Sequence, residues 1–215
     1  MRYHYGAVPE DPHFFPEAEG WQAIREPGPW MTQVIALPIA FMLLLVSSGL
    51  LYLVFSHILP FTQPFAISAL FISPWLLLVL LILLIPMHEL LHAVCHPGWG
   101  FSSNSVIGLW LSKALVYAHY EGVMARNRLL LVFAMPYIIL SLLPIPVLAV
   151  SGVFGWTLAT ALALAYLSLI GGVLACGDVV GFWLIISQIP NSAMVRNKGW
   201  KTYWKPRIPR DQSSE

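Results

Sequence analysis

The sequence predicts an all-α integral membrane protein with about four transmembrane helices and a short β-hairpin or re-entrant segment between the second and third helix. Composition is the first observation behind this prediction: 58% of the 215 residues are hydrophobic, only 10% are charged, and the mean hydropathy is +0.75. A soluble domain would contain about 25% charged residues. The second observation is that apolar stretches long enough to cross a hydrocarbon core of about 30 Å recur along the chain.

The predicted spans are the apolar segments at residues 31–55, 65–94, 129–150 and 153–189. Proline is expected to bend the second segment at Pro74 and Pro86 and to interrupt the third, because it cannot donate a backbone hydrogen bond. A tight turn at Ser151-Gly152 is predicted to follow the third segment. The fourth segment is too long for one plain span, and we expect a single helix, kinked at its glycines, that carries Asp178 in its inner half.

Residues 105–121 lie between the second and third segments and differ from both. They are rich in β-branched and aromatic residues and contain a turn candidate at Ser112-Lys113. This pattern predicts a β-hairpin or a partly re-entrant segment. Irregular backbone at membrane depth must be covered by protein or line a water-filled cavity.

The basic residues predict the orientation. In a four-span arrangement with both termini inside, all 11 Lys and Arg residues fall on the cytoplasmic side. The chain then divides into a cytoplasmic N-terminal tail (1–30), a membrane domain (31–189) and a basic cytoplasmic C-terminal tail (190–215). The first tail lacks a signal-peptide pattern and is expected to be irregular or to form a short interfacial cap. The second is expected either to lie against anionic lipid headgroups or to be solvated and disordered.

Global charge and cysteine content exclude two classes of protein. The net charge of +1 gives no reason to expect a nucleic-acid partner. The expected surroundings are the lipid bilayer, because the composition is so apolar. Two cysteines, Cys95 and Cys176, cannot form a disulfide framework, and we expect small buried apolar residues rather than metal ligands.

One stretch carries chemistry: His88-Glu89-Leu90-Leu91-His92 has the form His-Glu-x-x-His and ends a long apolar run. Residues four apart lie on one face of a helix, so His88 and His92 can face the same metal ion. Glu89 lies beside that position, where a carboxylate can take a proton from water. Ionisable groups beside such an apolar run are costly and indicate a functional site, here a Zn²⁺ site, rather than two hydrogen-bonded histidines at a helix end.

A catalytic zinc site needs a third protein ligand, and the candidates are His96, His119, Glu121 and Asp178. His96 is about 12 Å from His88 along a helix axis, too far to share an ion, and is expected to be a polar helix-end residue. Asp178 is preferred, because it lies as far along the fourth segment as His88 lies along the second, which brings both near the inner interface. His119 and Glu121 belong to the hairpin and remain alternatives, although we expect them to face water.

The His-Glu-x-x-His helix, the proline-interrupted third segment and the glycine-flanked Asp178 resemble an uncharacterised family of membrane proteins classed as zincin peptidases. That family is similar to the site-2 group of intramembrane metalloproteases. The resemblance covers about residues 65–188 and leaves out both tails. The site-2 proteases have Leu-Asp-Gly at their third ligand, whereas Gly177 precedes Asp178 here and Val179 follows it.

The resemblance implies metal-assisted hydrolysis of peptide bonds in membrane or membrane-proximal proteins, near the cytoplasmic face. Zinc would be held by His88, His92 and Asp178, with Glu89 as the catalytic base, and the hairpin at 105–121 could pair with an unwound substrate segment. The alternative is a non-catalytic metal carrier or assembly factor, which would use the same histidines but would not need Glu89.

Overall fold

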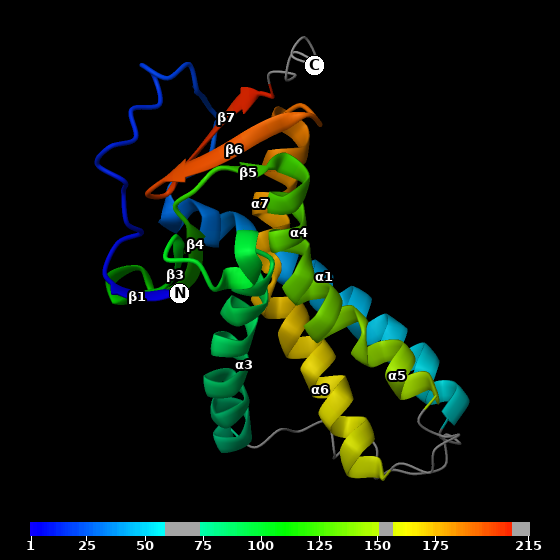
Figure 1. The fold of residues 1–215 in the computed structure, drawn as a ribbon. Helices are drawn as coiled ribbons and strands as arrows, with labels where there is room; N and C mark the ends of the chain where they lie inside the picture. The colour runs from blue at the N-terminus through cyan, green and yellow to red at the C-terminus, as the bar shows by residue number, and fades with distance from the viewer. Residues whose placement is uncertain (59–73, 151–156, 208–215) are drawn as a thin grey trace.

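The computed structural model describes residues 1–58, 74–150 and 157–207. Long apolar helices form one half of the molecule and two small β-sheets gather at the other end, beside the last turns of α3 and the start of α7 (Figure 1). The prediction of an all-α membrane protein with a possible short hairpin is therefore confirmed in part: the apolar helices are present, but the chain also forms two small sheets. The predicted start of the second span at residue 65 and the turn at Ser151-Gly152 lie outside the described residues.

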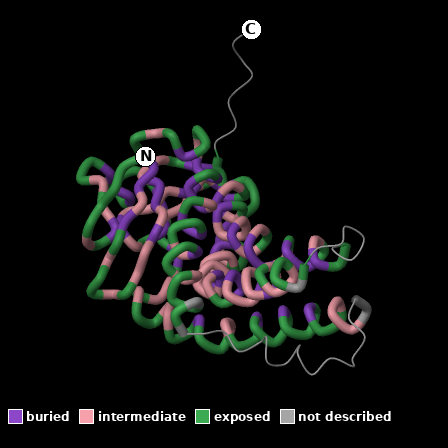
Figure 2. Tube along the Cα trace, turned by 90° about the horizontal axis from the view of Figure 1, so that it is seen from below, coloured by how far each residue is buried: buried purple, intermediate pink, exposed green. Residues whose placement is uncertain are grey.

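The helical segments are α1 (Pro29–Ile58), α3 (Pro74–Val94), α4 (Arg126–Pro136), the π-helical η3 (Tyr137–Leu142), α5 (Pro144–Val150), α6 (Leu158–Leu174) and α7 (Cys176–Gln188). Among the described residues, three helical stretches are long and apolar enough to cross a membrane, and α6 with α7 makes a fourth if the pair is one span. Buried residues concentrate where the helices meet the sheets, while many residues towards the far ends of the helices are exposed (Figure 2). Exposed apolar faces of this kind suit contact with lipid.

The third apolar segment stays helical through its prolines, since α4, η3 and α5 together form one stretch of 25 residues. The π-helical turn lies between Pro136 and Pro144, where prolines remove backbone donors from the helical ladder. Helix α6 packs closely on this turn at Gly171, where an added Cβ would lie 2.7 Å from the backbone of Leu140. The close approach therefore requires glycine at this position.

The fourth apolar segment is a bent pair of helices rather than the single helix that we predicted. Helices α6 and α7 meet at Ala175 with a bend of 50°. Glycines at 171, 172 and 177 flank the bend, and glycine is a poor helix former. The bend places Asp178 in the first turn of α7 instead of the middle of a helix.

The first sheet contains the predicted hairpin. Strands β3 (Ser105–Trp110) and β4 (Leu115–Tyr120) pair antiparallel, joined by a short 3-10 turn, η2 (Leu111–Lys113), which contains the expected turn residues. Strand β1 (Arg2–Tyr5) adds to the other side of β3 in parallel, so the order is β1-β3-β4. Strand β4 is therefore an edge strand.

The second sheet is built mainly from the two tails. Its order is β2 (Gln22–Ala23), β7 (Lys201–Pro206), β6 (Ala193–Lys198) and β5 (Met124–Ala125). The ring of Phe14 is wholly buried, edge-on to Trp21 at 5.6 Å and to Tyr203 at 5.9 Å between ring centroids. A disordered C-terminal tail is thus the wrong prediction as far as residue 207, and the N-terminal tail is folded against the same sheet.

Candidate metal centre

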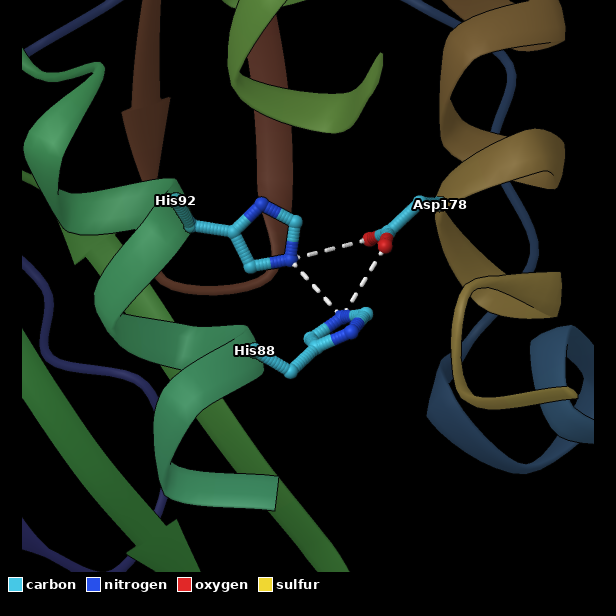
Figure 3. Close-up of side chains that lie close together, drawn as sticks. All are labelled: His88, His92 and Asp178. Atoms are coloured by element: carbon cyan, nitrogen blue, oxygen red, sulfur yellow. Dashed lines mark hydrogen bonds and ion pairs between the residues drawn. The ribbon is translucent and has the colours of Figure 1, made fainter. Parts of the chain in front are cut away.

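Three side chains from two helices converge at the junction of the helical half and the sheets. His88 and His92 lie on the last turns of α3, and Asp178 faces them from the first turn of α7 (Figure 3). The Nε2 atoms of the histidines are 3.1 Å apart. Asp178 Oδ2 lies 3.0 Å from Nε2 of His88, and Oδ1 lies 3.2 Å from Nε2 of His92. This is the one group of His, Cys, Asp and Glu side chains in the described part of the chain that could hold a metal ion.

The geometry of the three donor groups fits zinc. Ligand atoms on a tetrahedral Zn²⁺ at about 2.0–2.1 Å lie roughly 3.3 Å from one another. The two imidazole nitrogens are 3.1 Å apart, and each lies 3.0 or 3.2 Å from its own oxygen of Asp178, which is close to that spacing. Two imidazoles and one carboxylate also match the ligand types of catalytic zinc sites that keep a fourth position open.

Neighbouring backbone groups hold the two histidines in this orientation. Nδ1 of His92 lies 2.8 Å from the carbonyl oxygen of Val132 on α4, so this nitrogen donates and Nε2 is left as the lone-pair donor for a metal. The carboxyl end of α3 is fixed by Arg128, whose guanidinium donates to the carbonyls of Cys95 at 2.8 Å and His96 at 3.0 Å. His88 Nδ1 is buried and has no hydrogen-bond partner among the described residues.

Glu89 is buried beside the histidines, with 7% of its surface exposed, and its carboxylate lies at the cavity between α3 and β4. The backbone of Ala118 on β4 lies close to this carboxylate. The edge strand and the histidine helix therefore approach each other at the residue that the sequence singled out as a base.

The other candidate ligands point elsewhere. His96 is buried behind the helix end, with Nδ1 3.2 Å from Ser105 Oγ, and burial lowers its pKa to about 3. Glu121 pairs with Arg2 on β1. His119 was expected to face water, but it is buried. Neither Glu121 nor His119 joins the metal-binding group.

A cavity of about 530 Å³ opens in front of the three metal-binding side chains. Its walls come from the start of α1, from α3, from β4, from α7 and from the β6–β7 hairpin. Sequence reasoning missed the last wall, which contributes Asn197 and Thr202, and it missed Glu26 just before α1. The sequence has no motif around these residues, and only the pairing of the two tails brings them to the cavity. Cys176 also lines the cavity but is not part of the metal-binding group.

The fold and site define a chain of apolar helices with a buried two-histidine, one-carboxylate centre. The model of the family described as "Putative zincin peptidase" matches residues 81–194, which is more than half of the chain and includes the three metal-binding side chains and Glu89. The chain belongs to this family. No curated protein and no solved structure matches it.

Proposed function

We propose that this protein is a membrane-embedded zinc metallopeptidase that hydrolyses peptide bonds of membrane or membrane-proximal proteins. The observation that carries the proposal is the triangle of His88, His92 and Asp178 with the carboxylate of Glu89 beside it, all facing one cavity. Membership of a zincin peptidase family supports the same chemistry. A site that only stores or carries a metal has no use for a buried carboxylate placed next to the ligands.

In this proposal each residue has one role. Nε2 of His88, Nε2 of His92 and the carboxylate of Asp178 would hold zinc, which when bound polarises a carbonyl group and lowers the pKa of a bound water. Glu89 takes the proton of the attacking water and delivers it to the departing amine. Val132 acts through His92, and Arg128 acts through the carboxyl end of α3, so both are positioning residues.

The edge of β4 offers a place for an extended substrate. The amide of Glu121 donates to Asn104 across the hairpin at 3.0 Å, so alternate residues 115, 117 and 119 bond towards β3. Val116 and Ala118 therefore direct their backbone groups away from β3, towards the open edge of the sheet. Residues 114–119 line the cavity, so a substrate strand added to this edge passes in front of the metal-binding side chains.

Removal of zinc tests the function directly. The full-length protein, purified into lipid nanodiscs, is expected to cleave a library of quenched fluorescent peptides, to lose this activity on treatment with 1,10-phenanthroline and to recover it on addition of Zn²⁺. Ca²⁺ or Mg²⁺ should not restore cleavage, because hard cations prefer oxygen ligands. Cleavage that is unaffected when the zinc content falls to zero would contradict the proposal.

We further propose that both termini and the active site lie at the cytoplasmic face. All 11 basic residues fall on one side if α6 and α7 make one span. Cysteines introduced at Tyr5 and Gln212 are expected to react with a membrane-impermeant maleimide only after cells are permeabilised, whereas one at Gly152 should react in intact cells. Labelling of either terminus from outside would overturn this orientation.

A further inference from the structure

The wall of the cavity built by the two tails carries a second polar cluster, which we call the Glu26 pocket. It consists of Glu26, Asn197 and Thr202, with His119 from β4, and all four line the same cavity as the metal-binding side chains. Asn197 and Thr202 face each other in the β6–β7 register. The carboxylate of Glu26 accepts from the amide of Thr202 at 2.5 Å and from its hydroxyl at 3.3 Å, which fixes its position.

Acceptors in the Glu26 pocket lack donors. Oδ1 of Asn197 and Nε2 of His119 are buried and have no hydrogen-bond partner among the described residues, and His119 is only 5% exposed. Glu26 forms no ion pair in the described part of the chain. Buried polar groups that remain unpaired cost free energy, so unpaired atoms in side chains that line a cavity point to a ligand that supplies donors.

The pKa shifts of Glu26 and His119 agree with a pocket that accepts a cation. Burial raises the pKa of Glu26 to about 7, against smaller opposing effects of its bonds to Thr202 and the charge of Lys201. The pKa of His119 is lowered to about 4, first by burial and then by the charge of Arg2, so this imidazole is neutral at pH 7 and can accept a hydrogen bond. A cation beside Glu26 would favour the ionised carboxylate.

We propose that the Glu26 pocket binds the ammonium or guanidinium group of a Lys or Arg side chain in the substrate, a specificity that rests on the proposed peptidase function. Both groups are donors without acceptor atoms, which suits the carboxylate of Glu26 and the unpaired atoms Oδ1 of Asn197 and Nε2 of His119. Val8, Pro27 and Trp200 line the cavity as well and offer apolar surface to the aliphatic stem of such a side chain. A substrate strand on β4 sends alternate side chains to opposite faces, so one of them can enter the pocket.

The test measures binding without turnover. Zinc-loaded Glu89→Gln protein in nanodiscs is titrated with fluorescent, N-acetylated octapeptides that carry either Lys or norleucine at one central position. We expect the Lys peptide to bind about tenfold tighter or more at the position that reaches the pocket. The double variant Glu89→Gln with Glu26→Gln should lose this difference in affinity. Its affinity for the norleucine peptide should stay the same, because glutamine can still accept the hydrogen bonds from Thr202. Asn197→Ala should reduce the difference in the same direction.

The matched control is Glu17→Gln, which removes an exposed carboxylate of the same segment outside the cavity. It should preserve the preference for Lys. Equal binding of the two peptides, binding of neither, or an equal loss in Glu17→Gln overturns the proposal. A third peptide, with norleucine and a free amino terminus, tells a side-chain cation from the cation of the peptide's amino terminus. If this peptide alone binds more tightly in a way that depends on Glu26, the assignment to a side chain is overturned. Because no cleavage is measured, an inactive wild-type protein would refute the peptidase function without altering this result.

Discussion

Glu89→Gln is expected to lower the rate of peptide cleavage by about 10²-fold or more, while the protein keeps its zinc. Glutamine has the size and shape of glutamate, but it cannot take a proton from water. Glu89 is not among the three side chains that converge, so metal binding should not depend on it. The measurement is zinc per protein by inductively coupled plasma mass spectrometry, with the cleavage rate on the same sample.

Glu17→Gln serves as the control, since it removes a carboxylate that is exposed and lies outside the cavity. This variant should cleave at the wild-type rate. Unchanged turnover in Glu89→Gln would remove Glu89 from the mechanism. Loss of zinc together with activity would instead assign Glu89 to the metal ligands.

The same variant separates a peptidase from a metal carrier or assembly factor. A carrier must bind and release its ion, and its function should survive the loss of a base that touches no metal. A hydrolase needs the base at every turnover. Zinc retained with cleavage lost therefore favours the enzyme.

The sequence predicted those parts of the fold whose signals are local. Apolar runs predicted helices of membrane-spanning length, and the abundance of β-branched and aromatic residues predicted the β3–β4 hairpin. The pairing of β1 with β3 joins residue 2 to residue 106, and that of β2 with β7 joins residue 22 to residue 204. Partners so far apart leave no periodic pattern in a strand of two to four residues. The N-terminal tail was therefore expected to be irregular or an interfacial cap, and the C-terminal tail to lie against lipid headgroups or to be disordered.

The same limit applies to the site. The spacing of His88 and His92 and the depth of Asp178 could be worked out from helix geometry, since each depends on one regular element. The approach of Glu26 to the cavity depends on tails that fold back over the sheets. The half of the site around His88, His92 and Asp178 was thus within reach of the sequence, and the half built by the tails was not.

Asp178→Ala is expected to lower zinc affinity by about 10²-fold or more, because it removes one of three converging donor groups. His88 and His92 alone leave zinc with two protein ligands, fewer than the three of a catalytic site. Zinc content after dialysis against a chelator gives the affinity, and thermal unfolding gives an independent reading. Addition of zinc should raise the Tm of the wild type and leave that of the variant nearly unchanged, since a ligand stabilises the fold only as far as it binds.

Asp178→Asn keeps the volume of the side chain and its position at the start of α7, but removes the negative charge that favours a cation. It should bind zinc less tightly than the wild type. This result would show that the lower zinc affinity of Asp178→Ala does not come from a defect of packing. Glu121→Ala is the matched control, because Glu121 was the competing carboxylate and pairs with Arg2 instead. It should keep its zinc. Full zinc content in Asp178→Ala together with loss in Glu121→Ala would show that the carboxylate facing the histidines is not the one that binds the ion.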